Sequence, residues 1–173
     1  GIVGASRVGR RVAELLRPFD LDVVVHSPEL TPADAAAMGA RLGTLEEVAA
    51  ASDVLSLHQP LLPETAGQID ARVLGLLPDG ATVINTARGG VVDEAALVAE
   101  LRTGRIHAVL DVTDPEPPAP DSELWSLPGV VLTPHVAGST GTELHRIGEA
   151  VVAEVERFVH GHPFAHPEDL GGP

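Results

Sequence analysis

The sequence predicts an α/β fold in which a doubly wound, Rossmann-like parallel sheet forms the middle of three layers. Short apolar segments alternate with helical patterns along the 173 residues. The first apolar segment runs into the glycine-rich string GIVGASRVGRR, where a strand gives way to a helix. Strands that alternate with helices form parallel sheets with right-handed crossovers, and helices cover both faces of such sheets.

The first strand–helix–strand unit is short but complete in outline. Residues 2–3 form the end of a strand that is shorter than the usual length of roughly five residues, so we expect the protein to begin further upstream. Apolar residues at three- and four-residue spacing predict a helix over 8–16, which ends before Pro18. The apolar run within 22–26 predicts the second strand.

Two more helices and two more strands follow in the first half of the chain. A proline opens an alanine-rich helix over 32–39, and residues 40–42 form a minimal strand. Thr44 and Glu47 have the spacing of a capping box, which begins the next short helix. Residues 54–57 are apolar and predict the fourth strand.

The second half of the chain repeats the alternation. A helix over 71–77 ends at a Pro-Asp-Gly turn, and the β-branched residues that follow predict a buried strand over 81–87. The helical pattern over 93–102 ends at Gly104. Residues 107–112 then predict the sixth strand.

A proline-rich loop separates the last two strands. It covers 115–128 and precedes a strand over 130–133, after which apolar residues on one face predict a long amphipathic helix over 139–159. We therefore expect one domain over 1–160 and a linker over 161–173 that leads to a separate domain.

Composition excludes several classes of function. The net charge of −14 argues against a nucleic-acid partner, because counterion release needs clustered cations. No apolar run approaches ~18 residues and no basic segment precedes an apolar block, so we expect no membrane contact, no signal peptide and a cytoplasmic location. Cysteine, lysine and tyrosine are missing, which excludes disulfides, cysteine–zinc sites, lysine Schiff bases and a tyrosine–lysine catalytic pair.

The glycine-rich string matches two of the three glycines of a G-x-G-x-x-G loop. Gly4 and Gly9 would allow the tight turn and the close helix–strand packing that a bound pyrophosphate requires, whereas Ser6 replaces the middle glycine. Alone, the loop is equally compatible with a strand–helix turn that binds nothing.

Polar residues follow the predicted strands at their carboxyl ends, which is where ligands of doubly wound sheets bind. Besides the glycine loop, these residues are His26, Ser27, His58, Gln59, Arg88, Asp111, Glu116 and His135, with Pro60 and Pro134 next to them in the sequence. We expect them to converge on one site.

Three of these residues have the chemistry of catalytic groups. Arg88, which two glycines follow, offers a forked donor to a carboxylate, with a structural salt bridge as the alternative. Glu116 would favour the imidazolium form of His135 and orient its ring, which gives a proton donor and acceptor that works near neutral pH. Taken alone, a histidine after a strand is also typical of a helix cap or a surface position.

Five strings along the chain carry a family resemblance. They are GIVGASRVGRRV, LHQPLLPETAGQID, INTARGGVVDEAAL, LDVTDPEP and LWSLPGVVLTPHVAGST. In this order, and across nearly the whole chain, they resemble the NAD-binding domain of the D-isomer-specific 2-hydroxyacid dehydrogenases. The resemblance implies an oxidoreductase domain that transfers a hydride between a nicotinamide cofactor and a small D-2-hydroxy acid or 2-keto acid.

The resemblance also implies a role for each site residue. Arg88 would hold the substrate carboxylate and polarise its carbonyl, His135 would exchange the proton, and Glu116 would tune His135. Asp111 and the backbone of Thr86 and Ala87 would lie near the nicotinamide carboxamide. The predicted cofactor-binding residues are Gly4, Ser6, Arg7, Val8, Gly9, Ser27, His58, Pro60, Thr86, Ala87 and Asp111.

Three departures from the family pattern bear on these expectations. Ser6 either donates a hydrogen bond to a phosphate or holds the cofactor farther away. Ser27 stands where the family usually carries the acid that binds the adenosine ribose, with Glu29 as a candidate substitute, so NAD is the expected cofactor and NADP stays open. The substrate domain that the family builds from the flanking chain is largely absent from this sequence.

One alternative to the enzyme stays open. The chain could be a non-catalytic module of the corepressor type, which would sense a dinucleotide and bind another protein.

Two further expectations concern partners and metals. Related enzymes dimerise through this domain, so we expect a homodimer. The histidines of the tail, His160, His162 and His166, are interpreted as solvated residues and not as metal ligands, because no carboxylate stands at useful spacing.

Overall fold

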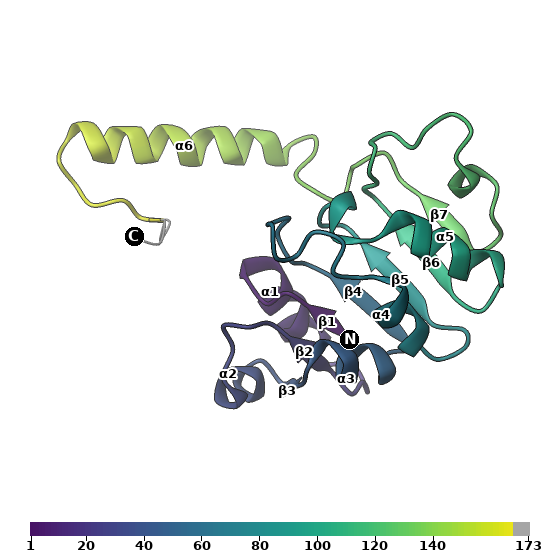
Figure 1. The fold of residues 1–173 in the computed structure, drawn as a ribbon. Helices are drawn as coiled ribbons and strands as arrows, with labels where there is room; N and C mark the ends of the chain where they lie inside the picture. Colours follow the sequence, from purple (N-terminus) through teal and green to yellow (C-terminus); the bar gives the residue numbers. More distant parts are fainter. Residues whose placement is uncertain (168–173) are drawn as a thin grey trace. The chain divides into compact units, whose positions relative to one another are not determined.

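A computed structural model describes residues 1–167 of the chain (Figure 1). The chain divides into two compact units, Gly1–His135 and Val136–Pro173. The division falls inside the range 1–160 that the sequence assigns to one domain. The last six residues of the predicted linker, 168–173, lie outside the described residues.

The first unit is built on a seven-stranded parallel sheet with the strand order β3-β2-β1-β4-β5-β6-β7. Its strands are β1 (Ile2–Val3), β2 (Val24–His26), β3 (Arg41–Leu42), β4 (Val54–Leu57), β5 (Thr82–Asn85), β6 (His107–Leu110) and β7 (Val130–Leu132). The chain runs outward from β1 to β3 and then returns to the other side of β1, so the order reverses between β1 and β4. The predicted doubly wound fold is confirmed.

Helices connect the strands of this unit (Figure 1). They are α1 (Arg7–Leu16), α2 (Pro32–Ala37), α3 (Leu45–Ala50), α4 (Ala71–Leu76) and α5 (Glu94–Arg102), with the 3₁₀ turns η1 (Gly89–Val91) and η2 (Glu123–Trp125). The predicted capping box of α3 is confirmed, because Glu47 N–H donates to Thr44 Oγ1 (3.2 Å) and Thr44 N–H donates to Glu47 Oε2 (2.9 Å).

Alternate residues of the central strands enter two separate hydrophobic clusters. Ile2 packs in a cluster with Ala13 of α1 and Ala35 of α2. Its neighbour Val3 belongs to the larger cluster, which includes Leu74 of α4 and side chains of α3 and α5. Because successive strand residues point to opposite faces, helices cover both faces at the centre of the sheet.

Several predicted elements end or begin one to four residues away from the observed boundaries, and two of these differences have local reasons. The strand predicted over 81–87 ends at Asn85, because the Asn85 side chain bonds the backbone that follows and turns the chain. The helix predicted from residue 139 begins at Glu143. Gly141 has a φ of 57° there, which a right-handed helix does not accommodate.

The second unit contains α6 (Glu143–Val159), which carries the predicted amphipathic pattern. The ring of Phe158 stacks on that of Phe164, with centroids 6.1 Å apart, and Arg157 Nε donates to the Pro163 carbonyl (2.7 Å). The apolar side chains of this helix, such as Val151, are exposed. Within residues 1–167, no helix combines the length and apolar character needed to cross a membrane.

We predict that Arg105→Ala lowers the free energy of unfolding by about 2 kcal/mol, because its guanidinium satisfies carbonyls at the end of α4. Arg105 donates to Leu74 O (2.8 Å), to Leu77 O and to Glu100 Oε2 (2.8 Å) and is only partly exposed. Urea unfolding monitored by circular dichroism measures the change.

Arg72→Ala is the matched control for this prediction. Arg72 pairs only with the exposed Glu46 among the described residues, and such surface pairs contribute less than about 1 kcal/mol. Equal losses in the two variants would show that the carbonyl contacts of Arg105 do not stabilise the fold.

Candidate active site

A cavity of about 710 Å³ opens at the carboxyl ends of the strands, beside the point where the strand order reverses. Segments that follow β1, β4 and β5 line it, and the lining residues are Ser6, Val8, His58, Gln59, Pro60, Leu61, Thr86, Ala87 and Arg88. Doubly wound sheets bind their ligands at this position. Seven of the residues predicted as catalytic or cofactor-binding therefore line this cavity.

The glycine loop forms one wall of the cavity, and its two glycines are required by close backbone contacts. A Cβ atom on Gly9 would lie 2.0 Å from the carbonyl oxygen of Gly4. Gly4 itself has a φ of 88°, and a Cβ there would lie 2.5 Å from the Gln59 nitrogen. The start of α1 is thus pressed against the end of β1, which aims the first-turn N–H groups of the helix at the cavity.

Ser6 and Ser27 have different positions at this loop. Ser6 is the N-cap residue of α1, makes no capping hydrogen bond with its side chain, and lines the cavity. Ser27 is buried behind the loop, where its Oγ accepts the N–H of Ala5 (3.1 Å). Ser27 and Arg7, which the sequence predicts as cofactor-binding residues, do not line this cavity.

The segment after β4 contributes a histidine whose ring is fixed. His58 Nε2 lies 2.9 Å from Ser56 Oγ. Burial lowers the pKa of His58 below its ordinary value, so the ring is neutral at neutral pH. Beside it, Gln59 is buried and its Nε2 has no hydrogen-bond partner among the described residues. The part of the cavity wall formed by His58 and Gln59 therefore offers polar atoms but no charge.

Asn85 is a site residue that the sequence interpretation missed. Its Oδ1 accepts the N–H of Ala87 (3.0 Å), and its Nδ2 donates to the carbonyl of Arg88 (2.9 Å). The side chain is buried and fixes the turn that presents Thr86, Ala87 and Arg88 to the cavity. The known preference of asparagine for bonding the backbone two residues ahead was the available signal.

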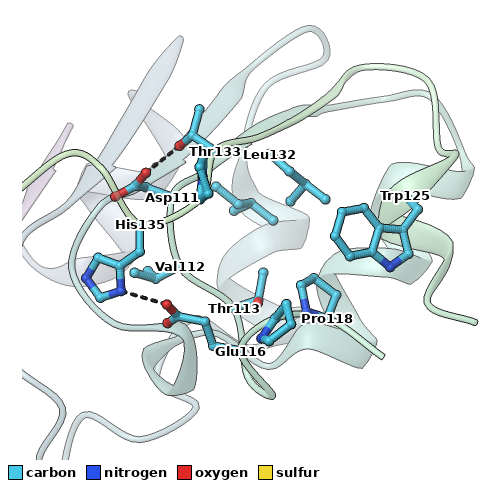
Figure 2. Close-up of a pocket in the computed structure, with 12 residues that line it drawn as sticks. Asp111, Val112, Thr113, Glu116, Pro118, Trp125, Leu132, Thr133 and His135 are labelled. Carbon is cyan, nitrogen blue, oxygen red and sulfur yellow. Dashed lines mark hydrogen bonds and ion pairs between the residues drawn. The ribbon is translucent and has the colours of Figure 1, made fainter. Parts of the chain in front are cut away.

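A second cavity of about 470 Å³ lies at the ends of β6 and β7 (Figure 2). Its lining includes Asp111, Glu116, Trp125, Thr133 and His135. Figure 2 shows the His135 ring and the Glu116 carboxylate directed toward one another, and Nδ1 lies 2.7 Å from Oε1. The predicted pair is thus formed, and Asp111 shares its cavity.

The backbone of His135 is constrained in a conformation that side chains rarely adopt. With a φ of 53°, His135 is the only non-glycine residue at positive φ within the part of the chain that the structure describes. Its N–H donates to the carbonyls of Asp111 (3.1 Å) and Thr133 (3.0 Å), which hold the backbone in place. Such strain is typical of functional sites, since the surrounding structure must offset it.

The two cavities are joined through a tight backbone contact. A Cβ on Gly89 would lie 2.1 Å from the carbonyl carbon and oxygen of Thr113, so the chain after Arg88 lies directly against the segment that leads to Glu116. Asp111 N–H also donates to the Asn85 carbonyl (2.9 Å). Arg88 itself is exposed, and its Nη1 donates to the Ala87 carbonyl (2.6 Å).

Two histidines near the end of the described chain lie beside each other. His160 and His162 lie near one another, with ring centroids 6.4 Å apart. Over residues 1–167, no group of three or more histidine, aspartate or glutamate side chains is arranged to hold a metal ion.

Comparison with known proteins gives one consistent family. Residues 1–137 match the model of the D-isomer specific 2-hydroxyacid dehydrogenase NAD binding domain. D-3-phosphoglycerate dehydrogenase of Mycobacterium bovis is 39% identical over 99% of this chain and 33% of its own length, and that of Bacillus subtilis is 38% identical over 94% and 31%. The chain thus spans about a third of the length of these curated relatives.

A solved structure is similar in both sequence and fold. The D-isomer specific 2-hydroxyacid dehydrogenase from Xanthobacter autotrophicus Py2, in complex with NADPH and MES, matches with a TM-score of 0.82 and 35% identity. The match covers 98% of this chain and 69% of that one.

We predict that Gly9→Ala destabilises the fold by about 1–3 kcal/mol, because the added methyl group would overlap the Gly4 carbonyl and force α1 away from β1. Thermal and urea unfolding measure the loss. Gly75→Ala in α4 is the control, since apart from the adjacent residues and the backbone of its own helix no atom lies within 4 Å of the added Cβ.

At the control position, alanine stabilises a helix by up to about 1 kcal/mol relative to glycine. The prediction is therefore a difference in sign between two substitutions of the same kind. A Gly9→Ala protein as stable as the parent would contradict the close approach in the loop.

Proposed function

The chain belongs to the D-isomer specific 2-hydroxyacid dehydrogenase family, and from this membership we propose that it is the coenzyme-binding and catalytic domain of a nicotinamide-dependent oxidoreductase. The substrate class we propose is a small D-2-hydroxy acid or the matching 2-keto acid. The observation that carries the proposal is the Glu116–His135 hydrogen bond, built on a strained backbone beside the coenzyme cavity.

The residues of the first cavity fit a dinucleotide. The glycine loop leaves no room for a Cβ at Gly4 or Gly9, and the N–H groups at the start of α1 suit a pyrophosphate. Ser6 adds a hydroxyl that its own helix does not use. We assign the phosphates to this loop, and the nicotinamide to the side of the cavity formed by Thr86, Ala87 and the adjoining Asp111. When bound, the coenzyme supplies or accepts the hydride.

His135 exchanges the proton in this mechanism. Its Nδ1 is engaged by Glu116, which leaves Nε2 as the nitrogen that faces the substrate oxygen. During reduction of a 2-keto acid, Nε2 gives its proton to the carbonyl oxygen as the carbonyl carbon receives the hydride, and the product is the 2-hydroxy acid. Oxidation reverses both transfers, and Glu116 keeps Nδ1–H in place throughout.

Arg88 binds the substrate carboxylate. A guanidinium offers two parallel N–H groups to a carboxylate, and its charge draws electron density from the neighbouring carbonyl. In the structure Arg88 is exposed at the edge of the first cavity, on the turn that Asn85 fixes. From this position it orients the reacting carbon between the two cavities.

We also propose that the intact protein is a cytoplasmic homodimer. The exposed apolar side chains of α6 offer a surface for contact with another chain, and the net charge of −14 disfavours a nucleic-acid partner. Because the relatives are named D-3-phosphoglycerate dehydrogenases, phosphorylated three-carbon acids are the first substrates to assay.

The proposed proton exchange predicts that His135→Asn lowers kcat for 2-keto acid reduction by about 10²- to 10⁴-fold in the intact protein. Asparagine tolerates positive φ, so the substitution removes the imidazole without adding backbone strain. Glu116→Gln lowers kcat by a smaller factor, and Arg88→Ala mainly raises the KM of the keto acid. Steady-state assays with NADH and NADPH measure all three.

His107→Asn is the matched control, because His107 is exposed at the amino end of β6, on the opposite edge of the sheet. The kcat of the His107→Asn protein is expected to equal that of the parent protein. An unchanged kcat in His135→Asn together with an unchanged KM in Arg88→Ala would overturn the catalytic assignment. Dinucleotide binding without turnover of any 2-keto acid by the parent protein would favour a sensing module of the corepressor type.

A further inference from the structure

Thr133 follows the last strand of the sheet, and the proposed mechanism gives its side chain no task. Its Oγ1 donates a hydrogen bond to Asp111 Oδ1 (Figure 2). Asp111 is buried, whereas Thr133 is exposed beside it. A buried carboxylate needs hydrogen-bond donors to offset the loss of contact with water. Thr133 therefore supplies a donor that helps to fix a buried acid at the carboxyl edge of the sheet.

The register of the sheet places Asp111 between the two parts of the candidate site. In the pairing of β5, β6 and β7, Asp111 stands one step beyond the last paired residues, in line with Thr86 on one side and Thr133 on the other. Thr86 lines the first cavity. The N–H of Asp111 also donates to the Asn85 carbonyl (2.9 Å). Asp111 thus connects the turn at the first cavity with the segment that leads to His135.

The segment 133–135 holds Asp111 through both its side chain and its backbone. Beside the hydrogen bond from the Thr133 hydroxyl to the carboxylate, the N–H of His135 donates to the Asp111 carbonyl (3.1 Å) and to the Thr133 carbonyl (3.0 Å). The backbone bonds hold His135 at its positive φ, whereas the hydroxyl acts on the carboxylate. Loss of the hydroxyl should therefore release the Asp111 side chain and leave the His135 backbone in place.

On these contacts we propose that Thr133 is a positioning residue for the coenzyme. Its hydroxyl holds the Asp111 carboxylate in the orientation that accepts an N–H of the nicotinamide carboxamide, which fixes the hydride-carrying ring relative to His135. An ionised carboxylate has about four lone-pair positions, so it can accept the coenzyme N–H as well as the Thr133 O–H. The inference rests on the proposed function, because it concerns the same coenzyme.

The expected effect follows from preorganisation of the carboxylate. A hydrogen bond to an ionised carboxylate is stronger than a bond between neutral groups. Without the Thr133 hydroxyl, the Asp111 side chain would have to be ordered when the coenzyme binds, and this cost lowers affinity. Transfer of a group between bound reactants is also sensitive to displacements of about 1 Å. We therefore expect losses in coenzyme affinity and in kcat, but none in the binding of the keto acid, which we assign to Arg88.

The test is isothermal titration calorimetry of the intact protein, without substrate, with two probes. The probes are NADH and its acetylpyridine analogue, in which a methyl ketone replaces the carboxamide and leaves no N–H to donate. The compared proteins are the parent, Thr133→Val, Thr133→Ala, Thr133→Ser and the control Thr82→Val. Thr82 lies at the amino end of β5, on the opposite edge of the sheet, so its substitution is the same chemical change away from the site. Thermal unfolding without ligand checks that each variant is folded.

We expect Thr133→Val and Thr133→Ala to bind NADH about tenfold more weakly than the parent. They should lower kcat by a similar factor, with an unchanged KM for the keto acid. Their affinity for the acetylpyridine analogue should equal that of the parent, because the analogue has no N–H for Asp111 to accept. Thr133→Ser should bind NADH like the parent, since it keeps the hydroxyl, and Thr82→Val should do the same.

A double variant tests whether Thr133 acts through Asp111. Asp111→Ala removes the acceptor of the hydroxyl, so adding Thr133→Val to it should cause no further loss of NADH affinity. Substitutions that remove one shared interaction are not additive, whereas independent effects add.

Three results would overturn the inference in a parent that binds NADH, and they leave the proposed function intact. They are hydroxyl-free variants that bind NADH as tightly as the parent, an equal loss of affinity for NADH and for the acetylpyridine analogue, and a further loss in the double variant. Failure of the parent to bind either NADH or NADPH would overturn both the inference and the proposed function.

Discussion

The parallel arrangement of seven strands is the constraint on which the rest of this structure depends. It brings every strand's carboxyl end to one edge, and the reversal of order between β1 and β4 opens a cavity there. The contact of Gly9 with the Gly4 carbonyl then fixes where the N–H groups of α1 point. The backbone alone therefore forms the cavity and positions the N–H groups that suit a coenzyme, without a contribution from charged side chains.

The candidate catalytic side chains are carried by short segments after the strands, and hydrogen bonds set the conformation of these segments. Asn85 fixes the turn of Arg88, and the Asp111 and Thr133 carbonyls hold His135 at positive φ. The contact of Gly89 with Thr113 couples the two segments. The side chains that we propose as catalytic are thus positioned by backbone contacts behind them, and Arg88, Glu116 and His135 remain exposed.

Sequence patterns predicted the order and type of the seven strands and six α-helices found in residues 1–167, because short apolar runs and capping residues are local signals. The pairing of Glu116 with His135 was predicted from chemistry and the order of motifs, and the structure forms it. The 3₁₀ turns were missed. Asn85 was also missed, since a side chain that bonds the backbone ahead of it is not distinguished in the sequence from one more strand residue. The division of the candidate site into two joined cavities depends on packing between distant segments, which no local pattern records.

The central claim is that this domain directs a hydride to carbon 2 of an acid. The most direct measurement is reduction of a 2-keto acid by the intact protein with a coenzyme deuterated at carbon 4 of the nicotinamide on the transferred face, with the product examined by NMR and chiral chromatography. The account predicts deuterium at carbon 2 of the D-hydroxy acid. A product without deuterium at that carbon, or one of the L configuration, would contradict it.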